Sequence, residues 1–273
     1  MAYRGRFAPS PTGDLHFGSL VTAVAGYLDA RRAGGEWLVL IEDVDQPRTV
    51  PGSSDRILHC LEGYGMHWDG AVMYQSQRGE AYAMALEQLG QLTYGCACSR
   101  SELTQHEYYP GTCRKGLANG RIARSRRVRV PDREILWEDR RLGPQRENLA
   151  ESVGDFVLRR ADGLWAYQLA VVVDDGAQGI TDIVRGEDLL TSTARQIYLQ
   201  ELLQMPHPRY WHVPLVLDAQ GQKLSKQTHA QPVPTCGSPI VLAKALRFLG
   251  EPVPSGLNEI APLWQWAISR HLT

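Results

Sequence analysis

An uninterrupted run of five apolar residues, at positions 37–41, is the feature that most narrows the choice of folds. Such a run without alternation is typical of a strand that is buried on both faces, as in a parallel sheet. A helical pattern over residues 19–32 precedes it and stops at Gly34 and Gly35. Residues 4–8 have the composition of a short strand. The order strand, helix, strand therefore predicts a βαβ unit at the start of an α/β fold.

The rest of the chain continues this alternation with one interruption. From residue 95 to about residue 133 the periodicity is lost and Cys, Gly and Arg dominate, which indicates an insertion in the sheet. Further helices are expected at residues 54–64, 80–92, 193–203 and 240–249. Further strands are expected at residues 128–130, 155–158, 166–173, 180–184 and 213–217. We therefore predict a Rossmann-like parallel sheet that carries an insertion and ends in a short helical tail.

Charge and cysteine content exclude several classes of protein. The chain has 29 Lys and Arg against 30 Asp and Glu. A protein that binds nucleic acid through an overall basic charge is therefore excluded, although a local basic patch is not. No apolar run is long enough to cross a membrane, and no secretory signal is recognised at the N-terminus. Five cysteines, an odd number, suit a reducing compartment better than a disulfide framework. We expect a cytoplasmic protein that makes no membrane contact.

Two loops have the composition of phosphate-binding segments. Residues 7–19 join the first expected strand to the first expected helix, whose N-terminus favours an anion; Gly18 allows close approach and His16 can donate to a phosphate oxygen. In the second loop, Lys223 and Lys226 flank Ser225 and can neutralise the charge of a departing pyrophosphate. Taken singly, a structural turn and a solvated loop explain these segments equally well or better.

Together the two loops resemble the signatures of class I aminoacyl-tRNA synthetases. His16-Phe17-Gly18-Ser19 resembles the HIGH signature, and Lys223-Leu224-Ser225-Lys226-Gln227 resembles the KMSKS signature. Ser19 and Gln227 depart from the usual residues at the ends of these signatures. Three further segments resemble the glutamyl-tRNA synthetase branch: Arg6-Phe7-Ala8-Pro9-Ser10-Pro11-Thr12-Gly13, Ile41-Glu42-Asp43-Val44-Asp45 and Val184-Arg185-Gly186-Glu187-Asp188-Leu189-Leu190.

The resemblance implies an ATP site and a magnesium ion bound with ATP. The residues implied to bind ATP are His16, Gly18, Ser19, Lys223, Ser225 and Lys226. We assign His16 and Lys226 the catalytic role of contacting phosphate in the transition state, because two anions must meet and neutralisation lowers the barrier. No dedicated magnesium cage is apparent in the sequence, so Mg²⁺ is expected to bridge phosphate oxygens.

A glutamate pocket follows from the same resemblance and from charge. Arg6 and Arg185 each end an expected strand and suit the two carboxylates, because a guanidinium fork binds a carboxylate bidentately. Glu42 and Tyr167 suit the substrate ammonium, and the family also uses Ala8 and Ser10. Without the motifs, surface salt bridges would explain the two arginines. Such a pocket rejects glutamine, because a neutral amide leaves an arginine unpaired.

Cys96, Cys98 and Cys113 lie within 18 residues, a spacing that fits a structural zinc site better than three free thiols. Ligand statistics make His106 the first candidate for the fourth ligand, whereas the resemblance points to Tyr109. Residues 114–133 then hold eight Lys or Arg and one acidic residue. This cluster predicts contact with the RNA backbone, the other interpretation being a solvated face. If it binds RNA, alanine at Arg126 and Arg127 weakens tRNA binding.

Length distinguishes the chain from full glutamyl-tRNA synthetases. Only 46 residues, 228–273, follow the second signature, too few for an anticodon-binding domain. The chain thus resembles a truncated paralogue that activates L-glutamate with ATP, without needing tRNA, and attaches it to the queuosine base of tRNA(Asp). We expect a monomer with four parts: residues 1–95 and 166–230 as two halves of a nucleotide-binding catalytic domain, 96–165 as a zinc-binding, acceptor-type insertion, and 231–273 as a helical tail.

Three rival functions remain open. A shortened glutamyl-tRNA synthetase would charge the 3′ end of tRNA(Glu) with the same catalytic residues. A related nucleotidyltransferase would need no tRNA, but the amino-acid pocket argues against it. A non-catalytic module that binds zinc and RNA would have no need of His16 and Lys226.

Overall fold

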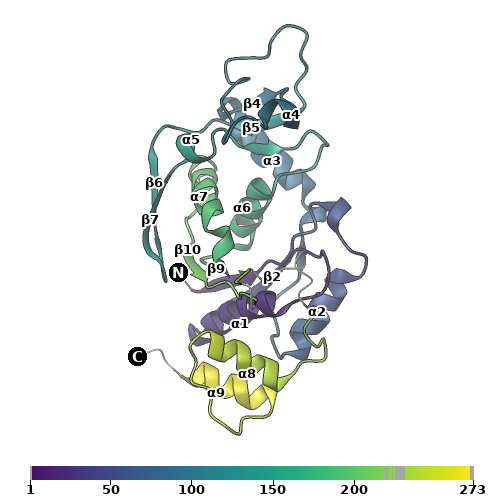
Figure 1. The fold of residues 1–273 in the computed structure, drawn as a ribbon, viewed down its shortest axis with the longest axis vertical. Helices are drawn as coiled ribbons and strands as arrows, with labels where there is room; N and C mark the ends of the chain where they lie inside the picture. The colour runs from purple at the N-terminus through teal and green to yellow at the C-terminus, as the bar shows by residue number, and fades with distance from the viewer. Residues whose placement is uncertain (1, 219–220, 223, 225–230, 271–273) are drawn as a thin grey trace. The chain divides into compact units, whose positions relative to one another are not determined.

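A computed structural model describes residues 2–218, 221–222, 224 and 231–270, and the chain forms two compact units. The first unit comprises residues 1–74, 180–190 and 208–273, and the second comprises residues 75–179 and 191–207. Each unit thus combines segments that are distant in the sequence (Figure 1).

The first unit is built on a parallel sheet. Its strands are β1 (Arg4–Phe7), β2 (Glu36–Ile41), β3 (Met73–Tyr74), β9 (Asp182–Gly186) and β10 (Arg209–Val213). Their order is β3-β2-β1-β9-β10, and every neighbouring pair is parallel. The predicted α/β fold with a parallel sheet is therefore confirmed. Because the chain enters each strand from the same end, the loops after β1, β2 and β9 gather at one edge.

Within its described residues, the first unit also has the α-helices α1 (Phe17–Arg32), α2 (Ser53–Gly63), α8 (Pro239–Phe248) and α9 (Ile260–Ser269). Trp37 of β2 is fully buried, with Phe7 stacked at 6.2 Å and Tyr27 of α1 edge-on at 5.2 Å. Gly26 permits this packing, because a Cβ there would lie 3.2 Å from the Trp37 indole nitrogen. Short 3₁₀ helices occur at Gln46–Arg48 and Glu187–Ser192.

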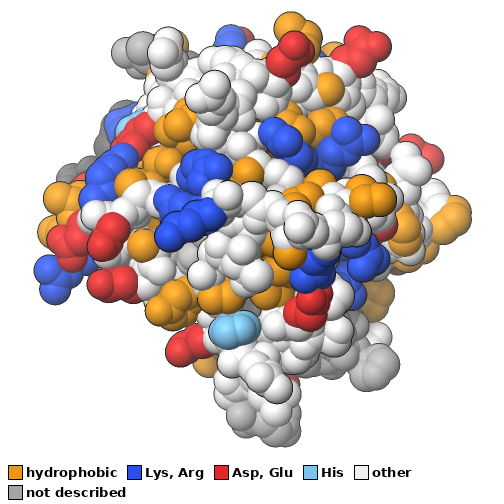
Figure 2. All heavy atoms as spheres, turned by 90° about the horizontal axis from the view of Figure 1, so that it is seen from above, with side chains coloured by type: hydrophobic (Ala, Val, Ile, Leu, Met, Phe, Trp, Pro, Cys, Tyr) orange, Lys and Arg blue, Asp and Glu red, His pale blue; other side chains and the backbone are white. Residues whose placement is uncertain are grey.

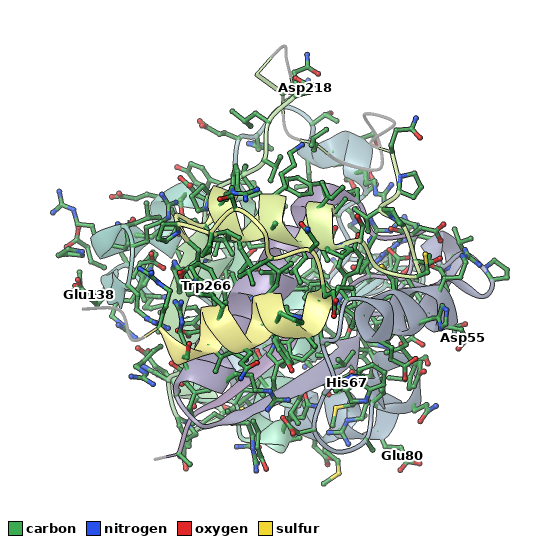
Figure 3. All side chains as sticks on the ribbon, turned by 90° about the horizontal axis from the view of Figure 1, so that it is seen from below. Asp55, His67, Glu80, Glu138, Asp218 and Trp266 are labelled. Carbon is green, nitrogen blue, oxygen red and sulfur yellow. The ribbon has the colours of Figure 1, made fainter. Side chains whose placement is uncertain are left out.

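The predicted helical C-terminal end is confirmed, and it belongs to the core. Helices α8 and α9 lie side by side against the purple α1 (Figures 1 and 3). The Trp264 indole N–H donates to the Tyr64 carbonyl at 2.7 Å, and the Arg32 guanidinium donates to the Ala267 carbonyl. Removing these helices would therefore expose apolar surface of α1. This exposure would destabilise the fold by about 25 cal/mol for each Å².

The second unit contains antiparallel strands and helices. The strands are β4 (Thr93–Cys96), β5 (Ser125–Val128), β6 (Glu134–Asp139), β7 (Gly143–Asn148) and β8 (Val157–Arg159). The helices are α3 (Gly79–Leu89), α4 (Arg100–Leu103), α5 (Leu149–Ser152), α6 (Tyr167–Gln178) and α7 (Thr193–Leu202), with 3₁₀ turns at Gln75–Gln77 and Gly90–Leu92. Strands β4, β5 and β8 form one antiparallel sheet, and β6 and β7 form a hairpin.

Two predicted strands are wrong. Residues 167–173 belong to helix α6, Ala166 is its N-cap, and residues 168–173 are all buried. A fully buried apolar run has no alternation, so periodicity alone does not separate a helix from a strand. The strand predicted at residues 213–217 instead occupies residues 209–213, and Pro214, which has no backbone N–H, follows its end. Among the described residues, no helix is long and apolar enough to span a bilayer.

Candidate active site and metal site

The loop between β1 and α1 places His16 at the start of the helix. His16 is the N-cap of α1, and its Nδ1 accepts the backbone N–H of Ser19 at 3.3 Å. The Ser19 hydroxyl lies 3.0 Å from Nε2, so a proton on Nε2 satisfies both contacts. His16, Gly18 and Ser19 are only partly buried. The imidazole is therefore fixed beside the helix N-terminus, where the partial positive charge favours a phosphate.

Leu224 within the second signature and residues after it lie close to this loop. A Cβ placed on Gly18 would lie 3.6 Å from the Leu224 carbonyl oxygen. His16 forms a β-bridge with Pro232, and the Val233 backbone N–H donates to the Leu15 carbonyl at 2.9 Å. The predicted residues Lys223, Ser225 and Lys226 lie outside the described residues. The two signatures nevertheless meet in one unit, because residues within and just after the second signature contact the first.

Arg6 and Arg185 occupy adjacent strands of the same sheet. Arg6 is on β1 and Arg185 on β9, and the two residues are 4% and 3% exposed. The register pairs Gly5 with Asp182, so Arg6 lies opposite Ile183, and Arg185 is two residues further along. Since side chains alternate along a strand, both guanidiniums leave the same face of the sheet.

Glu42 and Ser10 meet at the edge where β1 and β2 end. The Ser10 hydroxyl donates to Glu42 Oε2 at 3.2 Å, and the Glu42 backbone N–H donates to the Pro9 carbonyl at 3.0 Å. Ala8 follows β1 directly and is half-buried. The carboxylate of Glu42 is thus held at the carboxyl edge of the sheet, in the same unit as the two arginines.

The structure therefore brings most predicted pocket residues into the first unit. These are Arg6, Ala8, Ser10, His16, Gly18, Ser19, Glu42 and Arg185. Tyr167 is the first residue of α6 and belongs to the second unit. The assignment of these side chains to glutamate and ATP remains a prediction.

His212 is a residue that the sequence analysis missed. It is fully buried on β10, directly opposite Arg185, and its Nε2 accepts the Arg185 Nε–H at 3.0 Å. The Arg185 guanidinium also lies 5.3 Å from the centre of the Tyr210 ring, which stacks on the His212 ring at 6.2 Å. Because Nε2 accepts a hydrogen bond, His212 is neutral and carries its proton on Nδ1. Only the strand register, which pairs the two residues, reveals this contact.

In the second unit, Cys96, Cys98 and Cys113 converge. Their sulfur atoms all lie within 4.8 Å of one another, and Cys98 and Cys113 are 3.6 Å apart. The Tyr109 hydroxyl oxygen lies 3.4 Å from the Cys96 sulfur and 4.0 Å from the Cys98 sulfur. Ligands 2.3 Å from a tetrahedral zinc are separated by about 3.8 Å, so the residues fit such an ion. His106 is exposed and is not part of this group among the described residues.

Hydrogen bonds oppose the effect of burial on the thiol pKa at Cys96 and add to it at Cys98. Burial alone would raise the pKa of Cys96, but hydrogen bonds from Tyr109, the Cys98 backbone and Arg127 outweigh it and lower that pKa to about 7. Burial, together with the Cys113 and Cys96 sulfurs, raises the pKa of Cys98 to about 11. The Cys96 thiol is therefore about half ionised at neutral pH, and a metal would displace the proton of Cys98.

The basic segment after the cysteines is largely structural. Arg127 is buried, donates to the Asp155 carbonyl at 2.7 Å and lies 3.7 Å above the Tyr109 ring. Arg126 donates to the Thr93 hydroxyl, and Arg129 donates to the Arg114 carbonyl at 2.8 Å. Alanine at Arg126 and Arg127 would therefore disturb folding before it reported on RNA. Lys and Arg side chains nevertheless stand in several groups on one face of the molecule (Figure 2).

Comparison with known proteins identifies the relatives of this chain. The family model described as "tRNA synthetases class I (E and Q), catalytic domain" matches residues 2–236. A protein from Dechloromonas aromatica named "Glutamyl-Q tRNA(Asp) synthetase" is 56% identical over 97% of this chain and 92% of its own length. A protein of the same name from Thiobacillus denitrificans is also 56% identical, over 96% of this chain and 91% of its own length.

A solved structure has the same fold. The glutamate-tRNA synthetase of Elizabethkingia anophelis superposes with a TM-score of 0.74 at 32% identity. The match covers 83% of this chain and 53% of that protein, so the chain corresponds to about half of the solved structure.

Proposed function

Because this chain belongs to the glutamate and glutamine branch of the class I tRNA synthetases, we propose that it activates L-glutamate with ATP and transfers the glutamyl group to the queuosine base of tRNA(Asp). Relatives that share its length to within about a tenth bear the corresponding name. The observation that carries the proposal is that the first unit holds the first signature loop, with Leu224 of the second signature close to it, and two buried arginines on one face of its sheet.

The proposed reaction has two steps. In the first, an α-carboxylate oxygen of glutamate bonds to the α-phosphorus of ATP, and the bond to the pyrophosphate oxygen breaks. In the second, the queuosine base accepts the glutamyl group and AMP leaves. His16 and Lys226 would contact the phosphates, and Mg²⁺ bound with ATP supplies charge neutralisation. No nucleophile from the protein is needed, because positioning and electrostatics suffice for this displacement.

Arg6 and Arg185 would select the amino acid. Each is almost fully buried, so a neutral amide in place of a carboxylate would lose a charge-assisted hydrogen bond to a buried guanidinium. Glu42 is the proposed partner of the substrate ammonium. Ala8 and Ser10 would line the same pocket.

We also propose a structural zinc ion bound by Cys96, Cys98, Cys113 and the Tyr109 hydroxyl. The spacing of the three sulfurs and the phenol oxygen supports this ligand set. Bound there, the ion would join the end of β4 to the loop that carries Tyr109 and Cys113. Metal analysis of the purified protein and of a Tyr109→Phe variant tests the set, and full metal affinity in that variant would exclude Tyr109 as a ligand.

Two assays test the proposed reaction. Glutamate-dependent exchange between pyrophosphate and ATP is expected without any tRNA, and glutamine should not support it. Labelled glutamate should then appear on tRNA(Asp) that carries queuosine and not on the same tRNA without it. Labelling of tRNA(Glu) in place of modified tRNA(Asp) would favour the truncated glutamyl-tRNA synthetase, and absent exchange would refute both.

A further inference from the structure

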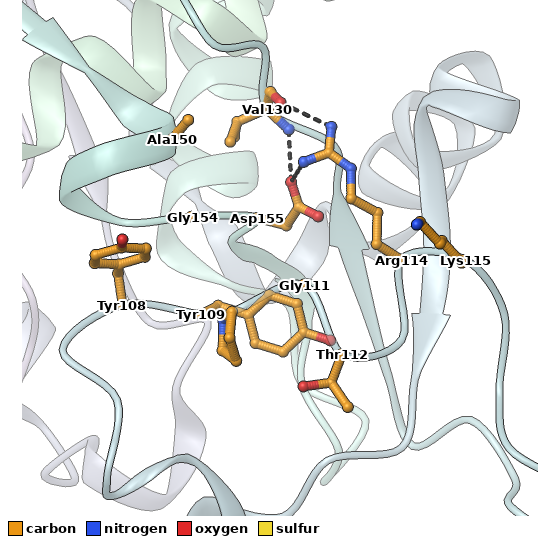
Figure 4. A pocket seen from close by; sticks show the side chains of 11 residues that line it. Tyr108, Tyr109, Gly111, Thr112, Arg114, Lys115, Val130, Ala150, Gly154 and Asp155 are labelled. Carbon is orange, nitrogen blue, oxygen red and sulfur yellow. Dashed lines mark hydrogen bonds and ion pairs between the residues drawn. The ribbon is translucent and has the colours of Figure 1, made fainter.

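A pocket beside the cysteine cluster has no role in the proposed chemistry. Its volume is about 340 Å³, and residues 108–112, Arg114, Lys115, Val130, Ala150, Gly154 and Asp155 line it. It lies wholly within the second unit, and the ring of Tyr109 forms part of its wall (Figure 4). This volume is at the lower end of the range for small-ligand pockets, about 300–1,000 Å³, and suits one nucleotide better than a peptide helix.

The walls of this pocket are held rigidly. The Arg114 guanidinium donates to Asp155 Oδ1 at 3.1 Å and to the Val130 carbonyl at 2.9 Å, and the Val130 backbone N–H donates to the same carboxylate. Gly154 has a φ of +69°, and a Cβ there would lie 2.3 Å from the Tyr109 carbonyl oxygen. The site is therefore preorganised, which lowers the entropic cost of binding.

Three side chains around the pocket are available to a ligand. Tyr108 is 43% exposed, and Lys115 and Thr112 are exposed as well. Within the described part of the chain, none of the three side chains has a hydrogen bond or an ion pair. Tyr108 and Lys115 lie at opposite sides of the pocket (Figure 4). An open aromatic ring, a free ammonium and a hydroxyl thus surround one cavity.

We propose that this pocket binds one unpaired nucleotide of the tRNA, with its base on the Tyr108 ring and its phosphate at the Lys115 ammonium. Stacking on an aromatic ring tolerates any base, and a lysine neutralises one phosphate. Among the described residues that line the pocket, Asp155 has the one carboxylate, and it is paired with Arg114, so the unpaired charge there is positive. The inference rests on the proposed transfer to tRNA, and it adds a contact that requires a single-stranded position.

The test compares substitutions that remove the Tyr108 ring, the Tyr108 hydroxyl alone, or the Lys115 charge. Tyr108→Ala is expected to weaken the Kd for tRNA(Asp) at least about five-fold, whereas Tyr108→Phe keeps the ring and should bind like the wild type. Lys115→Gln is expected to reduce the slope of log Kd against log salt by about 0.7. Arg146→Gln is the matched control, because Arg146 is an exposed cation on β7 outside the pocket.

Glutamate-dependent exchange and metal content distinguish a loss of tRNA binding alone from damage to the active site or to the metal site. Both are expected to stay at the wild-type level in all four variants. Unchanged tRNA affinity in Tyr108→Ala would overturn the pocket proposal, and so would equal losses in Tyr108→Ala and Tyr108→Phe or loss of metal in Tyr108→Ala. Competition by polyglutamate but not by oligouridylate would indicate an acidic protein partner and also overturn it. Absent exchange in the wild type would refute the proposed function, while the tRNA affinities would still decide about the pocket.

Discussion

Substitution of His212 tests whether the strand partner of Arg185 determines glutamate binding. His212→Ala removes the acceptor of the Arg185 Nε–H, in a place where both side chains are buried. A buried donor left without a partner costs about 1–3 kcal/mol, which corresponds to about 5- to 150-fold in affinity. If Arg185 holds a carboxylate of glutamate, the KM for glutamate should rise by that factor. The KM for ATP should change little, because the signature loops do not depend on this contact.

The assay is glutamate-dependent pyrophosphate exchange, with both substrates titrated. His212→Gln is the matched variant, because its side-chain oxygen can accept the same hydrogen bond, and it should recover most of the glutamate affinity. Thermal unfolding of each variant reports whether the cavity in the core has unfolded the protein. The reasoning is refuted if His212→Ala keeps the wild-type KM for glutamate, if both KM values rise equally, or if Gln is no better than Ala.

Three further predictions concern metal binding and stability. Between about pH 9 and pH 7, zinc affinity should fall at least about ten-fold for each pH unit in a competition titration, because the metal must displace the proton of Cys98, whose pKa is raised to about 11 by burial; a flat profile would contradict this. Arg127→Ala should lower the free energy of unfolding in urea by roughly 2–4 kcal/mol, since a buried charged hydrogen bond and a cation–π contact disappear. Burial acts to raise the pKa of Asp69, but hydrogen bonds from the Trp37 backbone and Arg31 lower it overall. Because the Asp69 side chain is 38% exposed and solvent screens its charge, Asp69→Asn should cost only about 0.5 kcal/mol above the unfolded pKa of 3.8, and the difference from wild type should vanish as pH falls through the lower folded pKa.

The sequence predicted those parts of the fold that depend on local pattern. The βαβ start, the position of His16 before the first helix and the convergence of Cys96, Cys98 and Cys113 are each confirmed. The prediction failed for residues 166–173, where an apolar run without alternation forms helix α6. Local pattern does not decide such a segment, because its conformation follows from what packs around it.

Charge composition also did not predict which basic residues are held by contacts within the protein. Eight basic residues in 20 positions indicated an RNA surface, yet Arg114, Arg126, Arg127 and Arg129 hold carbonyls, a hydroxyl or a carboxylate of the second unit. Lys115 and Arg124 have no such side-chain contact within the described residues. Composition counts charges, whereas only the coordinates separate a buried cation from one that faces solvent.

By itself, the sequence determined which chemical groups the protein possesses: two phosphate-type loops, arginines at strand ends and three close thiols. The types and spacings of these residues can be read from the sequence, because each motif is local. Only the tertiary structure determined which other residues contact them. The contact of Arg185 with His212 spans 27 residues and exists because parallel pairing of β9 and β10 fixes one register, and the pocket between Tyr108 and Lys115 exists because Gly154 of a distant loop closes on Tyr109. Such long-range pairings are set by packing of the whole unit, for which no short stretch of sequence carries the information.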